Sequence, residues 1–338
     1  MSSIFRPTTA DDETEIVAFL LRAFSLNRDA PFVEPSLLRW KYWEPRADCP
    51  DPRSFVMERG GRIVAHAGLW PVTVRTGANS ERGVHMIDWG SDPAAPGAGV
   101  SLLQHLTKKY DFVYAIGGSE MTQSILPKFG FRTIAEALTW ARPIRPWRQM
   151  LQHQRKDLRL PLRLARNTWW SRTPPRVIER GWAAVEPGAG GAEGAAVPAS
   201  ERDAPFFRYL DRCPVARCLT YDIVNEGRKA GFFALSVLRE QSRVAGVWLE
   251  NPSTENWRTA FHLAQDAALK HTNTSELVAS CATQASAAAA AQAGMRLRAR
   301  APVFLFRRGG CMEPLPLQFH LCDNDAVFLR GRPAGFLT

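Results

Sequence analysis

A short glycine-rich turn between a strand-like and a helix-like segment constrains this chain more than any other feature. The residues run Ile87-Asp88-Trp89-Gly90-Ser91-Asp92-Pro93-Ala94-Ala95-Pro96-Gly97-Ala98-Gly99-Val100-Ser101. Two glycines flank one alanine where the backbone must turn sharply. The first amides of a helix have no intrahelical acceptor, and the helix dipole adds roughly half a positive charge there. The turn therefore predicts an anion site, and a phosphorylated cofactor is the first ligand to consider.

Length and composition indicate a globular chain with room for two ordinary domains. It has 338 residues, of which 45% are hydrophobic. No apolar run reaches the roughly 18 to 20 residues that span a bilayer, and the first residues do not read as a signal peptide. The six cysteines lie far apart without a CxxC pair. We therefore expect free thiols, no metal site and a reducing, cytoplasmic location.

The positive charge is concentrated in one stretch. The net charge is +10, and eleven basic residues lie between Arg142 and Arg180, opposed only by Asp157 and Glu179. The first interpretation is a solvated connector between domains. The second is peripheral contact of residues 142–180 with an anionic lipid or polysaccharide surface. A specific nucleic-acid role ranks last because no helix-turn-helix or finger pattern occurs. The oligomeric state stays open.

The first part of the chain alternates strand and helix patterns. Strands are predicted at residues 4–7, 54–59, 63–74, 83–91, 112–116 and 131–141. Helices are expected after Thr9, after Ser36, from Val100 and after the cap Ser119. Gly60-Gly61 is a two-residue hairpin signal. Residues 1–141 therefore predict one mixed α/β domain, in which a hairpin meander leads into a parallel crossover.

The rest of the chain predicts a connector and a second domain. Residues 142–200 form the basic, tryptophan-containing connector, which ends in a flexible Gly/Ala loop at 187–200. In residues 201–338, strands are predicted at 219–224, 229–238, 242–250, 275–280 and 296–307, with helices at 257–271 and 282–293. The order repeats that of the first domain, so a duplicated fold is expected although no sequence repeat is visible. The predicted class is α/β, with a mixed, mostly antiparallel sheet and helices on both faces.

Two motifs carry a resemblance to a known family. Gly97-Ala98-Gly99 and Lys128-Phe129-Gly130-Phe131 lie about thirty residues apart in a strand–helix–strand–helix context. With this spacing, residues 4–140 resemble the GNAT superfamily of N-acyltransferases. Residues 201–338 resemble a second, degenerate GNAT-like half more loosely. No GxG follows Glu250, so a second cofactor site is not expected there.

The resemblance implies acetyl-CoA or another acyl-CoA as cofactor. Its pyrophosphate would lie on the amides of Gly97, Ala98, Gly99, Val100 and Ser101. Its pantetheine arm and thioester carbonyl would lie beside Trp89, Gly90 and Ser91, an oxyanion-hole arrangement. Ser119 stands where the family has an asparagine and still offers a hydrogen bond.

Three positions depart from the family pattern. The leading Arg or Gln of the loop is replaced by Ala94, and Pro96 removes one amide donor. The tyrosine that acts as the acid in the family falls on Leu126. These changes bear on turnover more than on the fold.

Asp88 and His85 are the candidate catalytic residues. Asp88 lies next to the predicted carbonyl-binding stretch and is a candidate base, the alternative being a structural acid paired with an arginine. His85 shares a strand face with Asp88 only if a bulge intervenes, since odd spacing puts the two on opposite faces. Asp323 and Asp325 favour an Asx turn over a site for an amine.

The predicted activity is transfer of an acyl group, acetyl in the first instance, from CoA to a primary amine such as an amino sugar or another small amine. Two alternatives stay open. One is an aminoacyl transferase of the type that builds peptidoglycan bridges, whose aminoacyl-tRNA donor suits the basic connector. The other is a non-catalytic acyl-CoA-binding scaffold, which Ala94 and Leu126 favour.

Overall fold

The computed structural model describes residues 3–28, 30–76, 79–152, 158–186, 199–200, 202–309, 319–325, 328 and 336–338. The chain divides into two compact units. Unit 1 comprises Met1–Ala135, Pro302–Leu315 and Asp323–Asp325. Unit 2 comprises Glu136–Ala301, Pro316–Cys322 and Ala326–Thr338.

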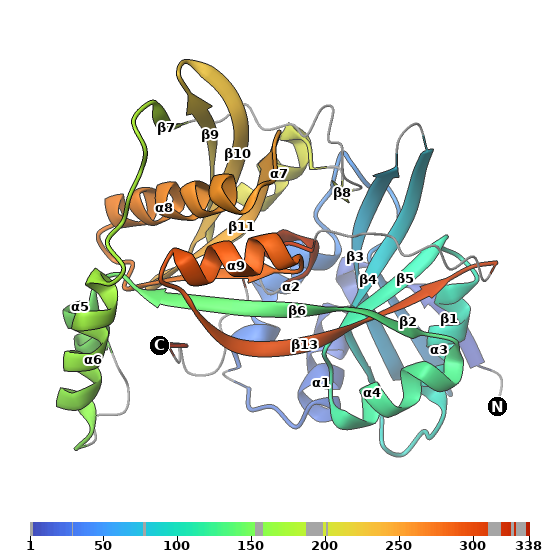
Figure 1. The fold of residues 1–338 in the computed structure, drawn as a ribbon. Coiled ribbons are helices and arrows are strands. Elements are labelled where there is room, and N and C mark those ends of the chain that lie inside the picture. The colour runs from blue at the N-terminus through green and yellow to red at the C-terminus, as the bar shows by residue number, and fades with distance from the viewer. Residues whose placement is uncertain are drawn as a thin grey trace. The chain divides into compact units, whose positions relative to one another are not determined.

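Unit 1 is built on a mixed sheet (Figure 1). Its strands, in spatial order, are β1 (Ser3–Pro7), β2 (Ser54–Arg59), β3 (Arg62–Thr76), β4 (Asn79–Ser91), β5 (Phe112–Ile116) and the end of β13 (Arg296–Arg307). Neighbours pair antiparallel except β4 and β5, which are parallel. The hairpin meander and the parallel crossover expected from the sequence are therefore both present.

Helices cover both faces of this sheet. The helix α3 (Ala98–Thr107) packs on one face, where it buries Leu102, Leu103 and Leu106 against Met86 and Phe304. The helices α1 (Glu13–Ala23) and α2 (Pro35–Tyr42) pack on the other. The remaining helical elements of unit 1 are α4 (Glu120–Ile125) and the short 3-10 turns η1 (Ala10–Asp12), η2 (Pro31–Val33) and η3 (Leu126–Phe129). Alternate residues of β4 thus face α3 or the α1–α2 pair.

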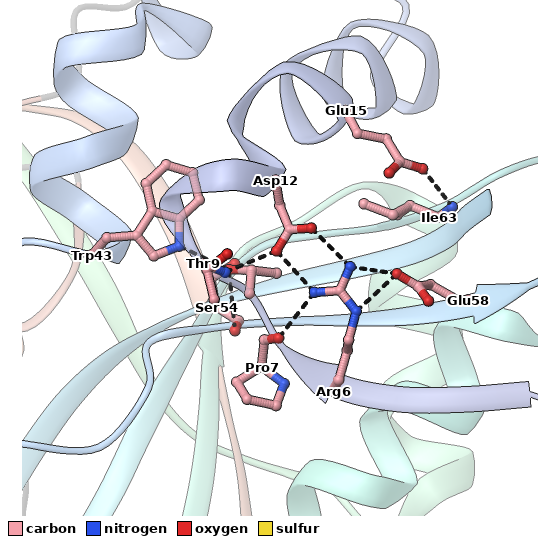
Figure 2. Close-up of polar contacts among 10 residues, drawn as sticks. Arg6, Pro7, Thr9, Asp12, Glu15, Trp43, Ser54, Glu58 and Ile63 are labelled. Carbon is pink, nitrogen blue, oxygen red and sulfur yellow. Dashed lines mark hydrogen bonds and ion pairs between the residues drawn. The ribbon is translucent and has the colours of Figure 1, made fainter. Parts of the chain in front are cut away.

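Polar contacts fasten α1 to the sheet (Figure 2). The Arg6 guanidinium donates to both oxygens of Asp12 at 2.8 Å and lowers the pKa of that carboxyl. The same guanidinium bridges to Glu58 of β2. The Glu15 carboxylate accepts from the amide of Ile63 at 2.9 Å, which ties α1 to the start of β3. These bonds place α1, and the α2 helix after it, over the face of β4 that carries His85.

Unit 2 repeats the same strand pattern. Its order is β6 (Arg132–Pro143, of which Glu136–Pro143 lie in this unit), β12 (Glu276–Cys281), β11 (Gln241–Leu249), β10 (Arg228–Val237), β9 (Arg217–Asn225) and β7 (Trp182–Val185). Among the described strands of this unit, β11 and β12 pair in parallel, and the other neighbours pair antiparallel. The helices are α5 (Pro146–Gln152), α6 (Leu160–Arg172), α7 (Ala204–Asp211), α8 (Thr254–Lys270) and α9 (Gln284–Gln292); β8 (Ala199–Ser200) and η4 (Leu321–Asp323) are short. The duplicated fold expected from the element order is present.

Neither unit is one continuous stretch of the chain. The end of β13, at Val303–Arg307, pairs with β5 and so belongs to unit 1. Conversely, residues 138–143 of β6 pair with β12 in unit 2. Each sheet thus covers one strand edge with a segment from the other half of the chain. The expected connector contributes α5, α6 and β7 to unit 2, and its Gly/Ala loop lies almost wholly outside the described residues. No helix in the described ranges combines the length and apolar character needed to cross a bilayer.

Candidate functional site

The strands β4 and β5 pair over only a short distance. The parallel register joins Gly83 to Phe112, Val84 to Val113 and His85 to Tyr114, and ends there. Beyond His85, β4 continues to Ser91, whereas β5 continues only to Ile116. The two strands therefore separate after His85, toward the end of β4 that leads to α3.

A β-bulge at Asp88 coincides with this separation. On β3, His66 pairs with Gly90 and Gly68 with Ile87, so Asp88 and Trp89 together oppose one residue. Asp88 has φ +50°, a left-handed conformation that few residues other than glycine adopt. The bulge brings Asp88 to the face that His85 occupies, which meets the condition the sequence set for these two residues.

Two side chains of α2 hold the Asp88 carboxylate. The Lys41 ammonium donates to Asp88 Oδ2 at 2.5 Å, and the Tyr42 hydroxyl donates to the same oxygen at 2.6 Å. Lys41 is fully buried and also lies 3.5 Å from Asp325 Oδ2. The partner of Asp88 is thus a lysine, where the sequence analysis considered an arginine.

Burial and charge act in opposite directions in this cluster. Burial alone would lower the pKa of Lys41, but the charges of Asp88 and Asp325 outweigh it and raise the pKa, so Lys41 is an ammonium. Burial and the nearby Asp88 raise the pKa of Tyr42 well above its ordinary value, which keeps the hydroxyl protonated as a donor. Burial raises the pKa of Asp325 to about 6, although Lys41 opposes the shift.

His66 fixes the backbone of Asp88. Its Nδ1–H donates to the Asp88 carbonyl at 3.1 Å, and its Nε2 accepts from the Ser54 hydroxyl at 2.9 Å. Burial lowers the pKa of His66 to about 4, so the ring is neutral at physiological pH. Both the side chain and the carbonyl of the bulge residue are therefore held by buried partners.

His85 lies at the point where the strands separate. Its ring stacks on Tyr114 with centroids 4.8 Å apart, and its Nε2 accepts from the Ile116 amide at 3.3 Å. Because Nε2 is the acceptor, the neutral ring carries its hydrogen on Nδ1. This Nδ1 is buried and has no hydrogen-bond partner in the described part of the chain. Burial lowers the pKa of His85 to about 3, so the ring is a neutral donor there.

The glycine turn leads into α3 with its amides directed outward. Gly97 is the N-cap residue at φ +80°, without a side-chain cap, and a Cβ at this position would meet nothing within 4 Å. The Ala98 amide donates to the Ala95 carbonyl at 3.1 Å and the Ser101 amide donates to the Gly97 carbonyl at 2.9 Å. Within the described chain, the amides of Gly97, Gly99 and Val100 are therefore the ones left without a backbone acceptor at this helix start. A Cβ on Gly99 would lie 3.2 Å from Ser91 Cβ, and the Trp89 indole donates to the Gly99 carbonyl at 3.0 Å. The helix start thus lies directly against the end of β4.

Two arginines share one carboxylate beside the turn. Asp92 Oδ1 accepts from the Ala94 amide at 2.9 Å, while Oδ2 receives Arg22 at 3.3 Å and Arg62 at 3.2 Å. The Ala94 amide, followed by the two arginines, lowers the pKa of Asp92. One carboxylate neutralises only one of two guanidiniums, which leaves positive charge beside α3. Ala94 stands where the family has an Arg or Gln, and Arg22 of α1 and Arg62 of β3 lie near it through their shared contact with Asp92.

Ser119 and Leu126 lie after β5. The Ser119 hydroxyl caps α4 by accepting from the Thr122 amide at 3.2 Å, so it is partly used within the chain. Leu126 is fully buried in the core beneath α3. A hydrocarbon side chain in that core supplies no acid at the position where the family has tyrosine.

The sequence did not reveal which residues hold the Asp88 bulge. Lys41 shares a helix face with Leu37 and Leu38, four and three positions before it, and this placement was the available signal for a buried, paired lysine. The link to Asp325, more than 280 positions away in the sequence, carries no local signal. In the part of the chain that the structure describes, no three His, Cys, Asp or Glu side chains gather in a metal-binding group.

The fold matches solved acyltransferase structures over most of the chain. A GCN5-related N-acetyltransferase from Anabaena variabilis matches at 10% identity and TM-score 0.56, covering 90% of this chain and 72% of its own. A tandem GNAT protein from the clavulanic acid biosynthesis pathway matches at 14% identity and TM-score 0.53, covering 92% and 100%. Saccharomyces cerevisiae N-myristoyltransferase, solved with myristoyl-CoA and inhibitors, matches at 13% identity and TM-score 0.55, covering 90% and 80%.

These likenesses show the fold. A scan against protein-family models and a search of curated proteins found no match. The chain has the fold of the GCN5-related N-acetyltransferases in its tandem form. The motifs at Gly97 and Gly130 indicated the family fold, and the repeated element order indicated the duplication.

Proposed function

We propose that the chain is an acyl-CoA-dependent N-acyltransferase whose donor site lies in unit 1 and whose acceptor is a primary amine. The observation that carries the proposal is the separation of β4 and β5 at a bulge, directly before an uncapped helix start with outward amides. This arrangement offers strand edge for an extended arm and helix amides for a phosphate in one place. The GNAT fold of solved acyltransferases supports it.

The residues present suit acyl-CoA. The amides of Gly97, Gly99 and Val100 would take the pyrophosphate, whereas those of Ala98 and Ser101 already donate to backbone carbonyls. Arg22 and Arg62 would add the charge that Ala94 does not supply. Trp89, Gly90 and Ser91 would hold the pantetheine arm along the end of β4. The buried His85 Nδ1–H, which has no acceptor among the described residues, fits a carbonyl oxygen of that arm.

When bound, acyl-CoA supplies a thioester whose carbonyl carbon an amine can attack. The backbone amides at the end of β4 would be the donors that stabilise the oxyanion formed on that carbonyl. Asp88 was the candidate base, but its Oδ2 already accepts from Lys41 and Tyr42. In this proposal Asp88 is a positioning residue that holds the bulge open, and His85 is a donor instead of a base, because its Nε2 is engaged by Ile116.

Calorimetric titration with acetyl-CoA tests the proposal. Gly97→Glu introduces a carboxylate at the helix start, where it repels phosphate and occupies the anion position. We expect wild-type binding in the micromolar range and a loss of at least about tenfold in the variant, a free-energy change of roughly 1.4 kcal/mol or more. Gly227→Glu is the matched control, because Gly227 also has φ +80° with no atom within 4 Å of a Cβ.

The outcomes separate the alternatives. Equal loss in both variants, or no binding of acetyl-CoA or longer acyl-CoAs by the folded wild type, would overturn the donor-site proposal and favour an aminoacyl-tRNA donor. Binding that depends on Gly97, without turnover across a panel of amines including amino sugars, would favour the scaffold alternative.

A further inference from the structure

The helices α5 and α6 expose apolar side chains on their outer faces. Five large hydrophobic residues in or next to these helices are exposed, although most such residues in the described chain are buried. They are Trp147, Leu151, Leu158, Leu162 and Trp169, each with more than 60% of its surface exposed. Figure 1 shows the two helices side by side in unit 2.

Two buried residues, Asn167 and Trp170, set the orientation of α6. Asn167 is buried and donates to the Gln149 side chain of α5 at 2.9 Å. Trp170 is buried, donates through its indole to the Gly294 carbonyl at 2.6 Å and lies under the Arg296 guanidinium. Because these two residues face the rest of unit 2, the opposite side of α6 faces outward.

The outward side of α6 carries a continuous apolar stripe. Leu162, Ala165 and Trp169 follow one another at helical spacings of three and four, and Leu158 lies in the turn just before the helix. Pro161, Leu164, Ala165, Trp169 and Arg172 line a shallow hollow on the same side. Leu162 is 72% exposed and Trp169 is 63% exposed, so the stripe is not part of the core.

Exposed positive charge flanks the stripe at Arg166 and Arg172. Residues 146–152 and 158–172 contain no Asp or Glu and also carry Arg148, Arg159 and Arg163, of which Arg163 has a buried Nε. Exposed Trp and Leu with flanking basic residues are typical of helices that lie in the headgroup region of a bilayer. A second copy of the chain would place these arginines against one another, and a nucleic acid would leave the leucines without a partner.

We propose that the outward face of α5 and α6 is a docking surface for an anionic phospholipid membrane. Trp169 and Leu162 enter the interface between headgroups and acyl chains, while Arg166 and Arg172 contact the lipid phosphates. The surface belongs to unit 2 and does not depend on acyl-CoA binding in unit 1. It would bring an acyltransferase to amine acceptors at a membrane.

Vesicle flotation with the full chain tests this proposal. One set of vesicles contains phosphatidylcholine alone, and the other contains phosphatidylcholine with phosphatidylglycerol. We expect flotation with the anionic vesicles only, weakened by added salt. Arg166→Gln with Arg172→Gln should reduce binding by about tenfold or more, since each basic residue near an anionic surface contributes separately.

Leu162→Ser with Trp169→Ser should also reduce binding to anionic vesicles by about tenfold, because apolar insertion is lost. Met121→Ser is the matched control, since Met121 of α4 is 71% exposed and lies in unit 1. Circular dichroism confirms that each variant folds. Equal binding to neutral vesicles, no binding to either set, or equal loss in the control overturns the proposal.

Two further measurements exclude other partners. Sedimentation of the free protein overturns the proposal if the wild type is an oligomer that the Leu162→Ser, Trp169→Ser variant dissociates. Binding of RNA or heparin that needs the arginines but is unaffected by loss of Leu162 and Trp169, without vesicle binding, overturns it as well.

Discussion

Units 1 and 2 share one strand pattern but differ where a helix follows the bulged strand. In unit 1 the helix begins after Gly97, at φ +80° and without a side-chain cap. In unit 2 the corresponding helix, α8, begins after Ser253, whose hydroxyl accepts from the Asn256 amide at 3.2 Å, and Glu255 lies in its first turn. The second helix start is therefore already satisfied by its own side chains, and the added carboxylate disfavours an anion.

The strand before α8, β11, keeps a bulge like that of β4 but lies beside another segment of the chain. The pairing of β10 with β11 shifts by one residue between Ala234 and Leu235, so unit 2 keeps a bulge. A Cβ on Gly246 of β11 would lie 3.2 Å from Cys322 Sγ, which shows that the chain itself lies beside this strand. A duplicated fold thus preserves strand order and bulge, whereas an anion site requires particular residues at one helix start.

The units differ most, among features that a single substitution can test, in how deeply a lysine–aspartate pair is buried. Lys41 of unit 1 is fully buried against Asp88, whereas the Lys229–Asp222 pair of unit 2, at 2.9 Å, leaves the two side chains 38% and 20% exposed. Lys41→Met should reduce the free energy of unfolding by about 3 to 5 kcal/mol, because it leaves a buried carboxylate unpaired. Lys229→Met should cost about 1 kcal/mol or less. Urea unfolding followed by circular dichroism and by tryptophan fluorescence measures both.

The double variant Lys41→Met, Asp88→Asn sharpens this test. Asparagine tolerates positive φ and removes the unpaired charge, so most of the lost stability should return. If Lys41→Met and Lys229→Met cost the same, the Lys41–Asp88 contact does not hold the bulge, and the account of Asp88 as a positioning residue is wrong.

Local patterns predicted most elements of both units. The strands at 54–59, 112–116 and 296–307 were predicted with their observed bounds. The strand at 112–116 is marked by a continuous apolar run that ends at Gly117, and the strand at 54–59 by the hairpin glycines Gly60 and Gly61. The helices α5 and α6 were missed because α6 buries Asn167 and exposes Leu162, so its apolar residues do not mark its core face. Much of the fold could therefore be predicted from the sequence, because hydrophobic periodicity depends on residues close together in the chain.

The candidate site could be predicted from the sequence only in part. The glycine turn and the place of Asp88 on β4 were visible, since both follow from short motifs. The Lys41–Asp88 pair, the orientation of His85 and the sharing of Asp92 by Arg22 and Arg62 depend on which elements pack together. The exchange of strand edges between the two halves of the chain likewise depends on long-range pairing, which no local pattern records.

The histidines of unit 1 make a second test, in which pH is varied. Burial lowers the pKa of His66 to about 4 and that of His85 to about 3, against an ordinary value of 6.5. Between pH 6.5 and 4 the unfolded chain therefore binds more protons at these sites, and stability falls as the pH falls. Asp325, with its pKa raised to about 6, acts in the opposite direction, because its folded form holds the proton.

His85→Gln should therefore flatten the loss of stability between pH 6 and pH 4 by about 1.4 kcal/mol per pH unit, the value of one proton. Asp325→Asn should steepen the loss by a similar amount. Unfolding in urea at a series of pH values gives both slopes. Slopes that match the wild type in both variants would show that these groups titrate alike in the folded and unfolded chain.

The helix starts provide the smallest and most direct contrast between the units. Ser253→Ala removes the cap of α8 and should lower the free energy of unfolding by about 1 kcal/mol, with no change in acetyl-CoA affinity. Gly97→Ala should lower it by about 1 to 2 kcal/mol, because alanine is strained at φ +80°, and Gly227→Ala should do the same. Of the three, Gly97→Ala alone should also weaken acetyl-CoA binding, since strain that moves the turn also moves the amides of α3. Weakened binding in Ser253→Ala would place an anion site in unit 2 and remove the functional distinction between the two halves.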